Sequence, residues 1–431
     1  MTGRAVRVCH VITRLDLGGA QDNTLYTVSH LRSPFAPSLV CGPGGILDPE
    51  VLRQGVPLRF VRSLQRLIRP HRDLEALARL ARLFREERPE IVHTHSSKAG
   101  IIGRLAARLA GVPHIVHTIH GYGFHDGQPW PLRRALIGAE RLASRVTTRF
   151  IAVSRANLEE GIALGLFTRD RVSLIRSGVR LGAFAAAARG GAGAEARSAL
   201  RRELGLPGDA PLVGMVACLK PQKSPLTFVE VAALVARQAP AAAFVMAGDG
   251  ELRPEVERRA RELNLSGRLH LLGWRRDVPR VMAALDVLLH TSLWEGLPRV
   301  LPEAIAASVP IVATGVDGTR DILRDGETGI VCAPLDAQGL AAGVLRLLGD
   351  RHLAAAIASR AREVLPEFDL DAMVRAQERL YLALIQGRQP GAGEGDARSG
   401  GPAIDSNDDA VVPGPGGGEV IAKPAAAAVT H

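Results

Sequence analysis

The apolar residues of this chain form a series of short runs separated by longer amphipathic segments. Strand-like runs occupy residues 6–12, 37–42, 89–96, 114–121, 149–154 and 172–179. Helical periodicity is clear in the segments 99–111 and 131–146, which lie between them. Short β-branched runs that alternate with helices of ten or more residues are typical of βαβ units with parallel strands. The first part of the chain is therefore predicted to be a doubly wound α/β domain.

A second alternation of the same kind follows an Ala/Gly-rich stretch at residues 185–206. Its strand-like runs lie at 212–220, 242–250, 268–273, 287–292 and 310–315. We therefore expect an N-terminal Rossmann-like domain at residues 1–190 and a second Rossmann-like domain at residues 191–371. A terminal helix is expected at 372–386. Residues 387–431 carry few bulky apolar side chains and are expected to be disordered.

The site of chemistry follows from this organisation. Parallel α/β sheets bind ligands beyond the carboxyl ends of their strands, where the strand order reverses. If these edges of the two domains face each other, the natural site is a cleft between them.

Length and cysteine content agree with two ordinary reduced domains. A chain of 431 residues exceeds the size at which one hydrophobic core keeps growing. Cys9, Cys41, Cys218 and Cys332 are scattered without metal-ligand spacing, so neither a zinc site nor a disulfide framework is expected. No run approaches a membrane span, and no secretory signal precedes the first strand. We expect a cytoplasmic protein.

Charge is distributed unevenly along the chain. Residues 1–200 carry 29 Lys and Arg against 15 Asp and Glu, while the remainder is slightly acidic. A basic domain suits nucleic acid, an anionic membrane surface or a phosphate-bearing substrate. Aromatic residues make up 4% and leave no stacking platform, so nucleic acid is not expected as a partner. One segment of this domain carries a cluster of arginines, which we expect to contact the inner face of the cell membrane: Arg133, Arg134, Arg141, Arg145 and Arg149. Simple solvation of a surface helix explains the cluster equally well.

The most informative segment is SLWEGLPRVLPEAIAASVPIVATG, in which seven residues separate Glu295 from Glu303. Two glutamates at this spacing are common, but here they lie between a strand, a helix and a further strand. The segment resembles the EX7E motif of the retaining glycosyltransferases of family 4, which have the two-lobed GT-B fold. The resemblance implies that Glu303 contacts the ribose of a nucleotide and that Glu295 lies beside the sugar. The resemblance also places Gly296, Leu297, Arg299 and Val300 among the residues that bind the donor. It implies that the first domain receives the acceptor and that the second domain binds the nucleotide sugar.

A second resemblance lies upstream, in ACLKPQKSP. It is similar to the family's GRLxxxKG loop, whose cations neutralise the donor diphosphate. Lys223 matches the family's Lys, whereas Cys218 replaces the usual Arg, and Lys220 is expected to take over part of its role. A leaving diphosphate needs charge compensation from cations or helix dipoles when no metal is present.

Two features of the first domain complete the expected site. Gly18 and Gly19 follow the opening strand, where glycines let the backbone approach an anion. His120 ends its strand directly before Gly121, where the resemblance places a residue close to the anomeric carbon of the donor. His93, His114 and His117 are interpreted as partnered core or edge residues, and no metal site is expected.

These features predict a retaining glycosyltransferase that moves a hexosyl or N-acetylhexosaminyl group from a nucleoside-diphosphate sugar to a hydroxyl acceptor. The acceptor is expected to be a glycan or a lipid-linked sugar in polysaccharide or glycolipid synthesis. The resemblance implies a metal-independent reaction without a cofactor. An alternative is a GT-B sugar-nucleotide epimerase, or a nucleotide-binding module without transfer activity.

Overall fold

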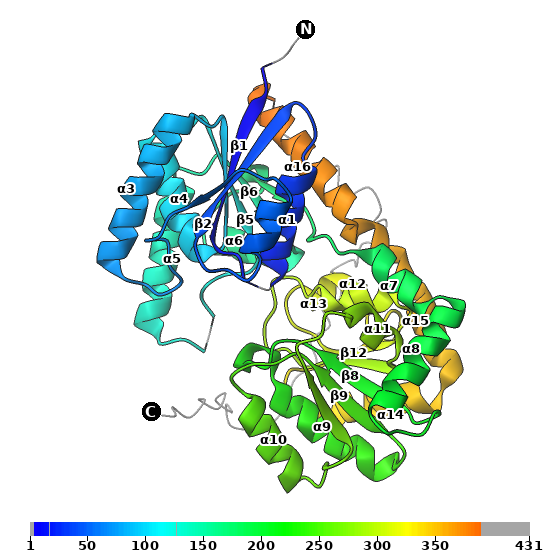
Figure 1. Cartoon of the computed structure of the whole chain (residues 1–431). Helices are drawn as coiled ribbons and strands as arrows, with labels where there is room; N and C mark the ends of the chain where they lie inside the picture. Colours follow the sequence, from blue (N-terminus) through cyan, green and yellow to red (C-terminus); the bar gives the residue numbers. More distant parts are fainter. Residues whose placement is uncertain (1–3, 17, 126, 389–431) are drawn as a thin grey trace, which may run out of the picture.

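The computed structural model describes residues 4–16, 18–125 and 127–388. They form two α/β lobes, one above the other in Figure 1, with the carboxyl edge of the first sheet toward the second lobe. All ladder pairs in both sheets are parallel. The predicted fold of two doubly wound domains is confirmed. The tail that we expect to be disordered lies, from residue 389 onward, outside the residues that the structure describes.

The first lobe is built on a seven-stranded sheet in the order β3-β2-β1-β4-β5-β6-β7. Its strands are β1 (Val6–Arg14), β2 (Phe35–Gly42), β3 (Leu58–Phe60), β4 (Ile91–His95), β5 (His114–Ile119), β6 (Arg149–Ala152) and β7 (Val172–Leu174). Its helices are α1 (Gly19–His30), α2 (Asp48–Arg53), α3 (Pro70–Glu87), α4 (Ser97–Leu109), α5 (Trp130–Ser144), α6 (Arg155–Ala163) and η1 (Arg169–Arg171).

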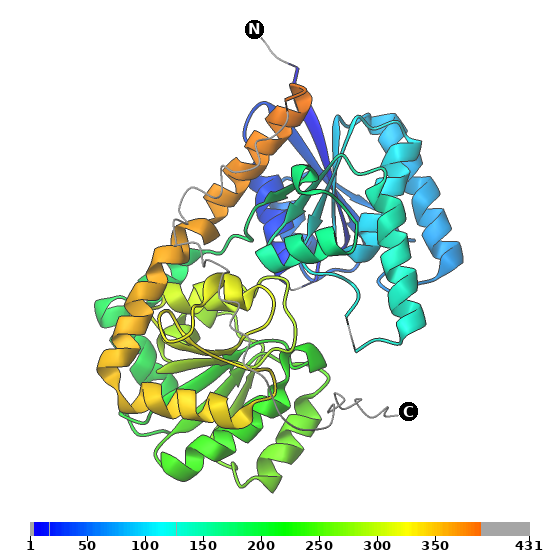
Figure 2. The same ribbon diagram turned by 180° about the vertical axis from the view of Figure 1, so that it is seen from behind.

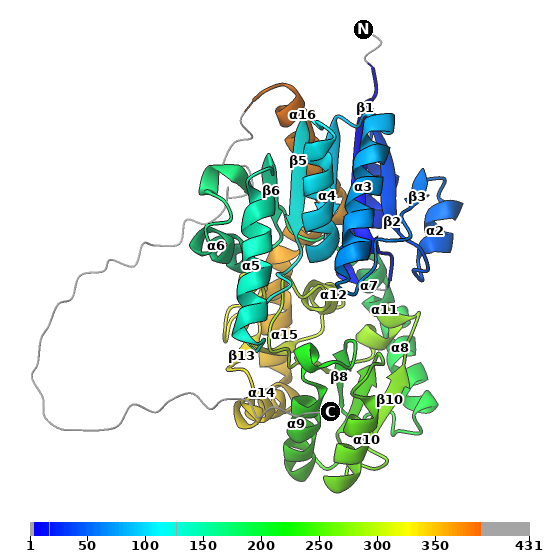
Figure 3. The same ribbon diagram turned by 90° about the vertical axis from the view of Figure 1, so that its left-hand side faces the viewer.

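Helices α3, α4 and α5 stand side by side on one face of this sheet (Figure 3). The amphipathic pattern of α3 explains its orientation, since Ala76, Leu80 and Phe84 are buried whereas Arg79 and Arg82 are exposed. Burial of apolar area of this kind contributes roughly 25 cal/mol per Å².

One expectation for the surface of this lobe is wrong. Arg149 does not belong to an exposed arginine cluster, because it lies in β6 and is 4% exposed. Its guanidinium donates to the Ser173 hydroxyl and to the Asp170 carbonyl. The alternation of strand residues turned this side chain inward, where its donors are satisfied. Arg134, Arg141 and Arg145 are exposed, as expected.

The second lobe is built on a six-stranded sheet in the order β10-β9-β8-β11-β12-β13. Its strands are β8 (Leu212–Val216), β9 (Ala243–Ala247), β10 (Leu269–Gly273), β11 (Val287–His290), β12 (Ile311–Thr314) and β13 (Ile330–Cys332). Its helices are η2 (Pro221–Lys223), α9 (Pro225–Gln238), α10 (Arg253–Glu262), α11 (Val278–Ala283), α12 (Val300–Ala306), α13 (Thr319–Ile322), α14 (Ala337–Gly349), α15 (Arg351–Ala361) and η3 (Arg362–Phe368).

The chain passes between the lobes twice. After β7 it enters α7 (Leu181–Ala188) and α8 (Gly190–Glu203), and α7 packs against α11 and α12 of the second lobe. The Ala/Gly-rich stretch is thus helical, and the chain already packs against the second lobe before residue 190. The domain ranges expected from the sequence, 1–190 and 191–371, stay a prediction. The last helix, α16 (Leu370–Ile385), runs back along the molecule to the first lobe (Figure 2). There, Tyr381 packs with Val8 and Ile91.

Among the residues that the structure describes, no helix is both long and apolar enough to cross a membrane.

Candidate active site between the two lobes

The lobes touch where the loop after β5 meets the loop before α12. Gly121 has a φ of 133°, a conformation that favours glycine, and the position of a Cβ there lies 3.5 Å from the Gly296 Cα. A Cβ on Gly296 would lie 2.0 Å from the His120 carbonyl oxygen. Both glycines are therefore needed for this approach, which brings His120 to the loop that carries Glu295.

Glu295 is 7% exposed and is held from several sides. Its Oε1 accepts from the Lys223 ammonium and, at 2.7 Å, from the Ser292 hydroxyl. His290 Nε2 lies 3.4 Å from the same oxygen. Burial alone would raise the pKa of Glu295, but Lys223 and His290 outweigh it and hold this pKa well below its usual range. Glu295 is therefore a fixed carboxylate.

Glu303 lies in the first turn of α12 and has the opposite electrostatic character. Its removal from water raises its pKa to about 7; nearby Arg299 opposes this rise and Asp22 adds to it. The two glutamates that the sequence singled out are thus one permanent anion and one group that titrates near neutrality. Helix α12 has only seven residues. Its dipole is therefore only a weak source of positive potential.

Lys223 and Lys220 also differ from each other in their electrostatic surroundings. Lys223 is paired with Glu295, with 19% of its side chain exposed. Lys220 makes no ion pair with any residue that the structure describes, and burial together with the neighbouring charge of Lys223 lowers its pKa. Lys220 is therefore the cation of this loop that has no counter-charge.

The Gly18–Gly19 loop lies under Arg299. A Cβ on Gly19 would come within 2.8 Å of the Arg299 Cδ. Arg299 Nη1 also donates to Asp22 Oδ2 across the cleft at 2.9 Å, and the Arg299 Nε has no hydrogen-bond partner among the described residues. Of the remaining predicted donor residues, Leu297 is buried and Val300 is half-buried in the second lobe. Leu297 and Val300 thus pack on the core of the second lobe, whereas the other predicted residues lie where the two lobes meet; their individual roles stay predictions.

His120 is supported from inside the first lobe by a row of imidazoles. His120 Nε2 lies 3.1 Å from His95 Nδ1, and His95 Nε2 lies 3.0 Å from His10 Nδ1. Burial lowers the pKa of His120 to about 4 and that of His10 to about 3. The row is therefore neutral and fixes the plane of the His120 ring.

His10, His93 and His95 come close enough to suggest a metal site, with candidate ligand atoms within 4.8 Å of one another. Both nitrogens of His93 already have partners, namely the Tyr381 hydroxyl at 2.5 Å and the Thr118 hydroxyl at 2.7 Å. The nitrogens of His95 are likewise used in the imidazole row. These contacts match the interpretation of His93 as a partnered core residue, and His117, bonded to Thr94 at 2.9 Å, fits it as well.

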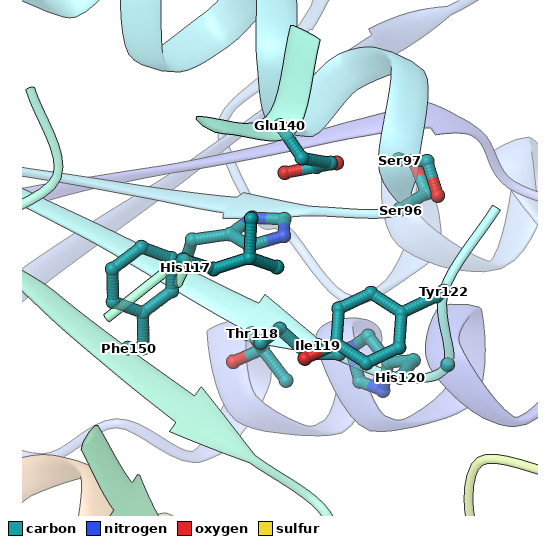
Figure 4. Close-up of a pocket in the computed structure, with 11 residues that line it drawn as sticks. Ser96, Ser97, His117, Thr118, Ile119, His120, Tyr122, Glu140 and Phe150 are labelled. Atoms are coloured by element: carbon teal, nitrogen blue, oxygen red, sulfur yellow. The ribbon is translucent and has the colours of Figure 1, made fainter. Parts of the chain in front are cut away.

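A pocket opens behind the His120–Gly121 turn (Figure 4). It is lined by polar side chains, among them Ser97, His117, Tyr122 and Glu140, and also by the apolar Ile119, Phe150 and Leu166. Glu140 is paired with the buried Arg104 at 2.5 Å, so the pocket contains a compensated charge. The pocket lies directly beside the predicted site.

Several residues of the cleft were missed from the sequence. Asp22 and His10 carry no motif, although a histidine inside the apolar run VCHVI was a signal. Asp321 pairs with Arg176 and accepts from the Arg155 amide at 2.6 Å. This contact joins the two lobes at the edge of the cleft.

Comparison with known proteins decides the family. Residues 17–182 match the model "Glycosyltransferase Family 4", and residues 196–364 match "Glycosyl transferases group 1". A UDP-Gal:alpha-D-GlcNAc-diphosphoundecaprenol alpha-1,3-galactosyltransferase of Escherichia coli is 32% identical over 89% of this chain and 98% of its own length. The chain belongs to the family 4 glycosyltransferases.

Solved structures show the same fold for this glycosyltransferase. HepE of Anabaena, in complex with UDP, has a TM-score of 0.75 at 21% identity, with 88% of this chain and 100% of that chain covered. Sucrose-phosphate synthase of Thermosynechococcus elongatus also gives 0.75, at 20% identity, with 89% and 100% covered. The predicted GT-B fold and membership of the family are confirmed. The alternative of an epimerase or a binding module is not favoured.

Proposed function

We propose that this glycosyltransferase moves a hexosyl or N-acetylhexosaminyl group, with retention, from a nucleoside-diphosphate sugar to a hydroxyl of a glycan or lipid-linked acceptor. The observation that carries the proposal is the contact between the turn at His120 and the loop that bears Glu295 and its partner Lys223, with Glu303 on the helix that follows this loop. The similar E. coli enzyme is named for a UDP-galactose donor and a diphosphoundecaprenol acceptor, which makes such a lipid-linked sugar the first acceptor to test.

In the proposed complex, the ionised Glu303 accepts hydrogen bonds from the ribose diol of the donor. Lys220 supports the diphosphate as the cation without a counter-charge, while Lys223 is shared between the diphosphate and Glu295. Arg299 adds a third cation from above the Gly18–Gly19 loop. These charges supply the electrostatic compensation that a metal ion would otherwise provide, so we propose a metal-independent reaction without a cofactor.

The proposed chemical step takes place on one face of the sugar. The bond between the anomeric carbon and the diphosphate oxygen breaks, and a bond from the same carbon to the acceptor oxygen forms. The acceptor proton passes to the departing diphosphate oxygen, so no protein nucleophile is required. Glu295 and His120 hold the sugar, which keeps the reacting atoms in position.

We further propose that the enzyme acts at the inner face of the cell membrane as a peripheral protein. Exposed Arg134 and Arg141 on α5, together with Trp130, 67% exposed, and Leu132, 44% exposed, combine positive charge with apolar area. Such surfaces suit an anionic leaflet, where a lipid-linked acceptor would be found.

The test is a transfer assay with a panel of nucleotide sugars and synthetic lipid-diphosphate N-acetylglucosamine. We expect nucleoside diphosphate and an elongated lipid with the donor's anomeric configuration. An inverted product would overturn retention. Hydrolysis or epimerisation without transfer would overturn the assigned reaction.

A further inference from the structure

The loop at residues 61–69 joins β3 to α3 at the edge of the first sheet that faces the second lobe (Figure 1). Lys98, in the first turn of α4, donates to the Leu67 carbonyl and so fixes the backbone of this loop. Ser97, the neighbour of Lys98, lines the same pocket as His120. The loop is therefore held beside the turn through which the first lobe meets the second.

Arg66 is a cation of this loop that has no counter-charge. Its side chain is exposed, and it makes no ion pair with any residue that the structure describes. Lys98 behaves differently, because it is paired with Asp73 at 2.6 Å. The positive charge of Arg66 is therefore available to an anion from outside the chain.

The charge of Arg66 acts on Lys220 of the second lobe. Burial is the main cause of the lowered pKa of Lys220, and the positive charges of Lys223 and Arg66 lower it further. Interactions between exposed charges fade beyond about 10 Å in physiological salt, so Arg66 lies near Lys220 across the cleft. Like charges repel each other unless an anion lies between them. Two cations without counter-charges, one on each lobe, thus form the walls of an anion site.

The second lobe alone has little free positive charge to offer here. Lys223 is shared with Glu295, and Cys218 carries no positive charge at the position where the resemblance to the family predicted an arginine. A diphosphate carries more than one negative charge, so Lys220 does not compensate it fully. Arg66 supplies a second unshared cation from the opposite side.

We infer that Arg66 and Lys220 bind a diphosphate ester between them, from opposite sides of the cleft. The planar guanidinium of Arg66 offers two parallel hydrogen bonds to phosphate oxygens, and the Lys220 ammonium acts as a point charge. The proposed donor and the proposed lipid-linked acceptor both carry such a group. The donor is expected, because Lys220 belongs to the loop proposed to hold its diphosphate. The inference rests on the proposed function for the source of the diphosphate and adds a residue of the first lobe to that site.

The test is calorimetry with three ligands, none of which requires transfer: pyrophosphate, UDP and a short-chain, water-soluble lipid-diphosphate N-acetylglucosamine. For Arg66→Gln we expect the dissociation constant of pyrophosphate to rise about fivefold or more, because charge-assisted hydrogen bonds are lost. The difference from wild type should shrink at high salt. Arg66→Lys should give an intermediate affinity, since it keeps the charge but loses the planar fork.

The other two ligands identify the source of the diphosphate. A matching loss of affinity for UDP assigns the site to the donor. A loss for the lipid-diphosphate sugar, with unchanged affinity for UDP, assigns it to the acceptor. Wild-type affinity of Arg66→Gln for all three ligands would overturn the inference, and so would a wild-type chain that does not bind pyrophosphate.

Arg69→Gln is the matched control. Arg69 is exposed at the end of the same loop, and its substitution removes the same charge. Its affinities should stay within about twofold of wild type, because a charge farther from the site is screened. An equal loss in Arg69→Gln would show a general effect of net charge and would contradict the assignment to Arg66.

Stability separates binding from a structural role. Without ligand, Arg66→Gln should melt at the wild-type temperature, because Arg66 has no ion pair among the described residues. Pyrophosphate should then raise its melting temperature less than that of the wild-type chain. A lower melting temperature without ligand, with equal stabilisation by pyrophosphate, would show that Arg66 acts on the fold. Since these measurements need no transfer, a failed transfer assay would contradict the proposed function and leave the anion site standing.

Discussion

Arg299 of the second lobe donates a hydrogen bond to Asp22 of the first lobe across the cleft, with 2.9 Å between Nη1 and Oδ2. Both residues also act on the pKa of Glu303, which Arg299 lowers and Asp22 raises. The contact that joins the lobes is thus coupled to the ionisation of the residue proposed to bind the nucleotide. Closure of the cleft and donor binding are therefore expected to share a pH dependence.

The first prediction concerns the affinity for the donor. Because the pKa of Glu303 is raised to about 7, its carboxylate form is lost as the pH falls through that value. The dissociation constant of a nucleotide sugar should rise roughly fivefold between pH 7 and pH 6, because the ionised fraction of Glu303 falls from about one half to about one eleventh over this interval. Calorimetry between pH 5.5 and 8.5 measures this. His120, with a pKa of about 4, stays neutral over this range.

Glu303→Gln is the control for this titration. It keeps the size of the side chain but cannot ionise, so it should bind the donor weakly and with a flat pH profile. A profile as steep as that of the wild-type chain would assign the titration to another group.

The second prediction concerns the position of the same titration. Asp22→Asn removes a negative charge that raises the pKa of Glu303, so the fall in donor affinity should move to lower pH. Arg299→Gln should move it to higher pH. The Asp22 side chain is 48% exposed, and an ion pair of this kind is worth about 1 kcal/mol or less. Melting temperatures should therefore change by only a few degrees, and an unmoved titration in both variants would contradict the coupling.

The third prediction separates stability from activity at Lys223. Lys223→Met leaves the buried Glu295 carboxylate without its main counter-charge, which should lower the free energy of unfolding by about 3 kcal/mol. Adding Glu295→Gln should restore much of that stability but not kcat, which we expect to stay about 100-fold or more below wild type. Urea denaturation and transfer kinetics measure the two effects. Recovery of activity in the double variant would show that Lys223 acts only on the fold.

Lys220 provides the contrasting prediction. It has no ion pair among the described residues, so Lys220→Ala should leave the free energy of unfolding unchanged or slightly higher. Its kcat should nevertheless fall at least about tenfold, because a positive charge beside the proposed diphosphate is lost. A large loss of stability with normal kcat would contradict the role proposed for Lys220.

The last prediction concerns the membrane. Flotation with anionic liposomes should recover the protein at low salt but not at high salt, because each arginine near the surface contributes about 1 kcal/mol and is screened by ions. Reversing the charge of Arg134, Arg141 and Arg145 should abolish flotation. Arg202→Glu, an exposed change in the second lobe, is the matched control and should float normally. Binding of the triple variant that persists at high salt would contradict the proposal.

Sequence periodicity predicted both sheets because parallel strands and their helices are local patterns. Likewise, Glu295 and Glu303 could be singled out because they lie on one short segment. The partners of these residues could not be predicted, since Lys223 and Glu295 are 72 positions apart, as are His10 and His95 at 85. Arg149 shows the same limit: its place at the start of a strand-like run was visible in the sequence, but the residues that meet its guanidinium, Ser173 and Asp170, were not.

The return of α16 to the first lobe has a consequence for biosynthesis. Tyr381 and Met373 close the core formed with Val8 and Ile91, yet they are translated after the whole second lobe. A nascent chain that has emerged only as far as residue 180 still lacks this cover, so the lobe made first is completed last. Folding on the ribosome therefore cannot finish domain by domain in gene order, and a fragment ending before Leu370 is expected to expose the face that α16 covers.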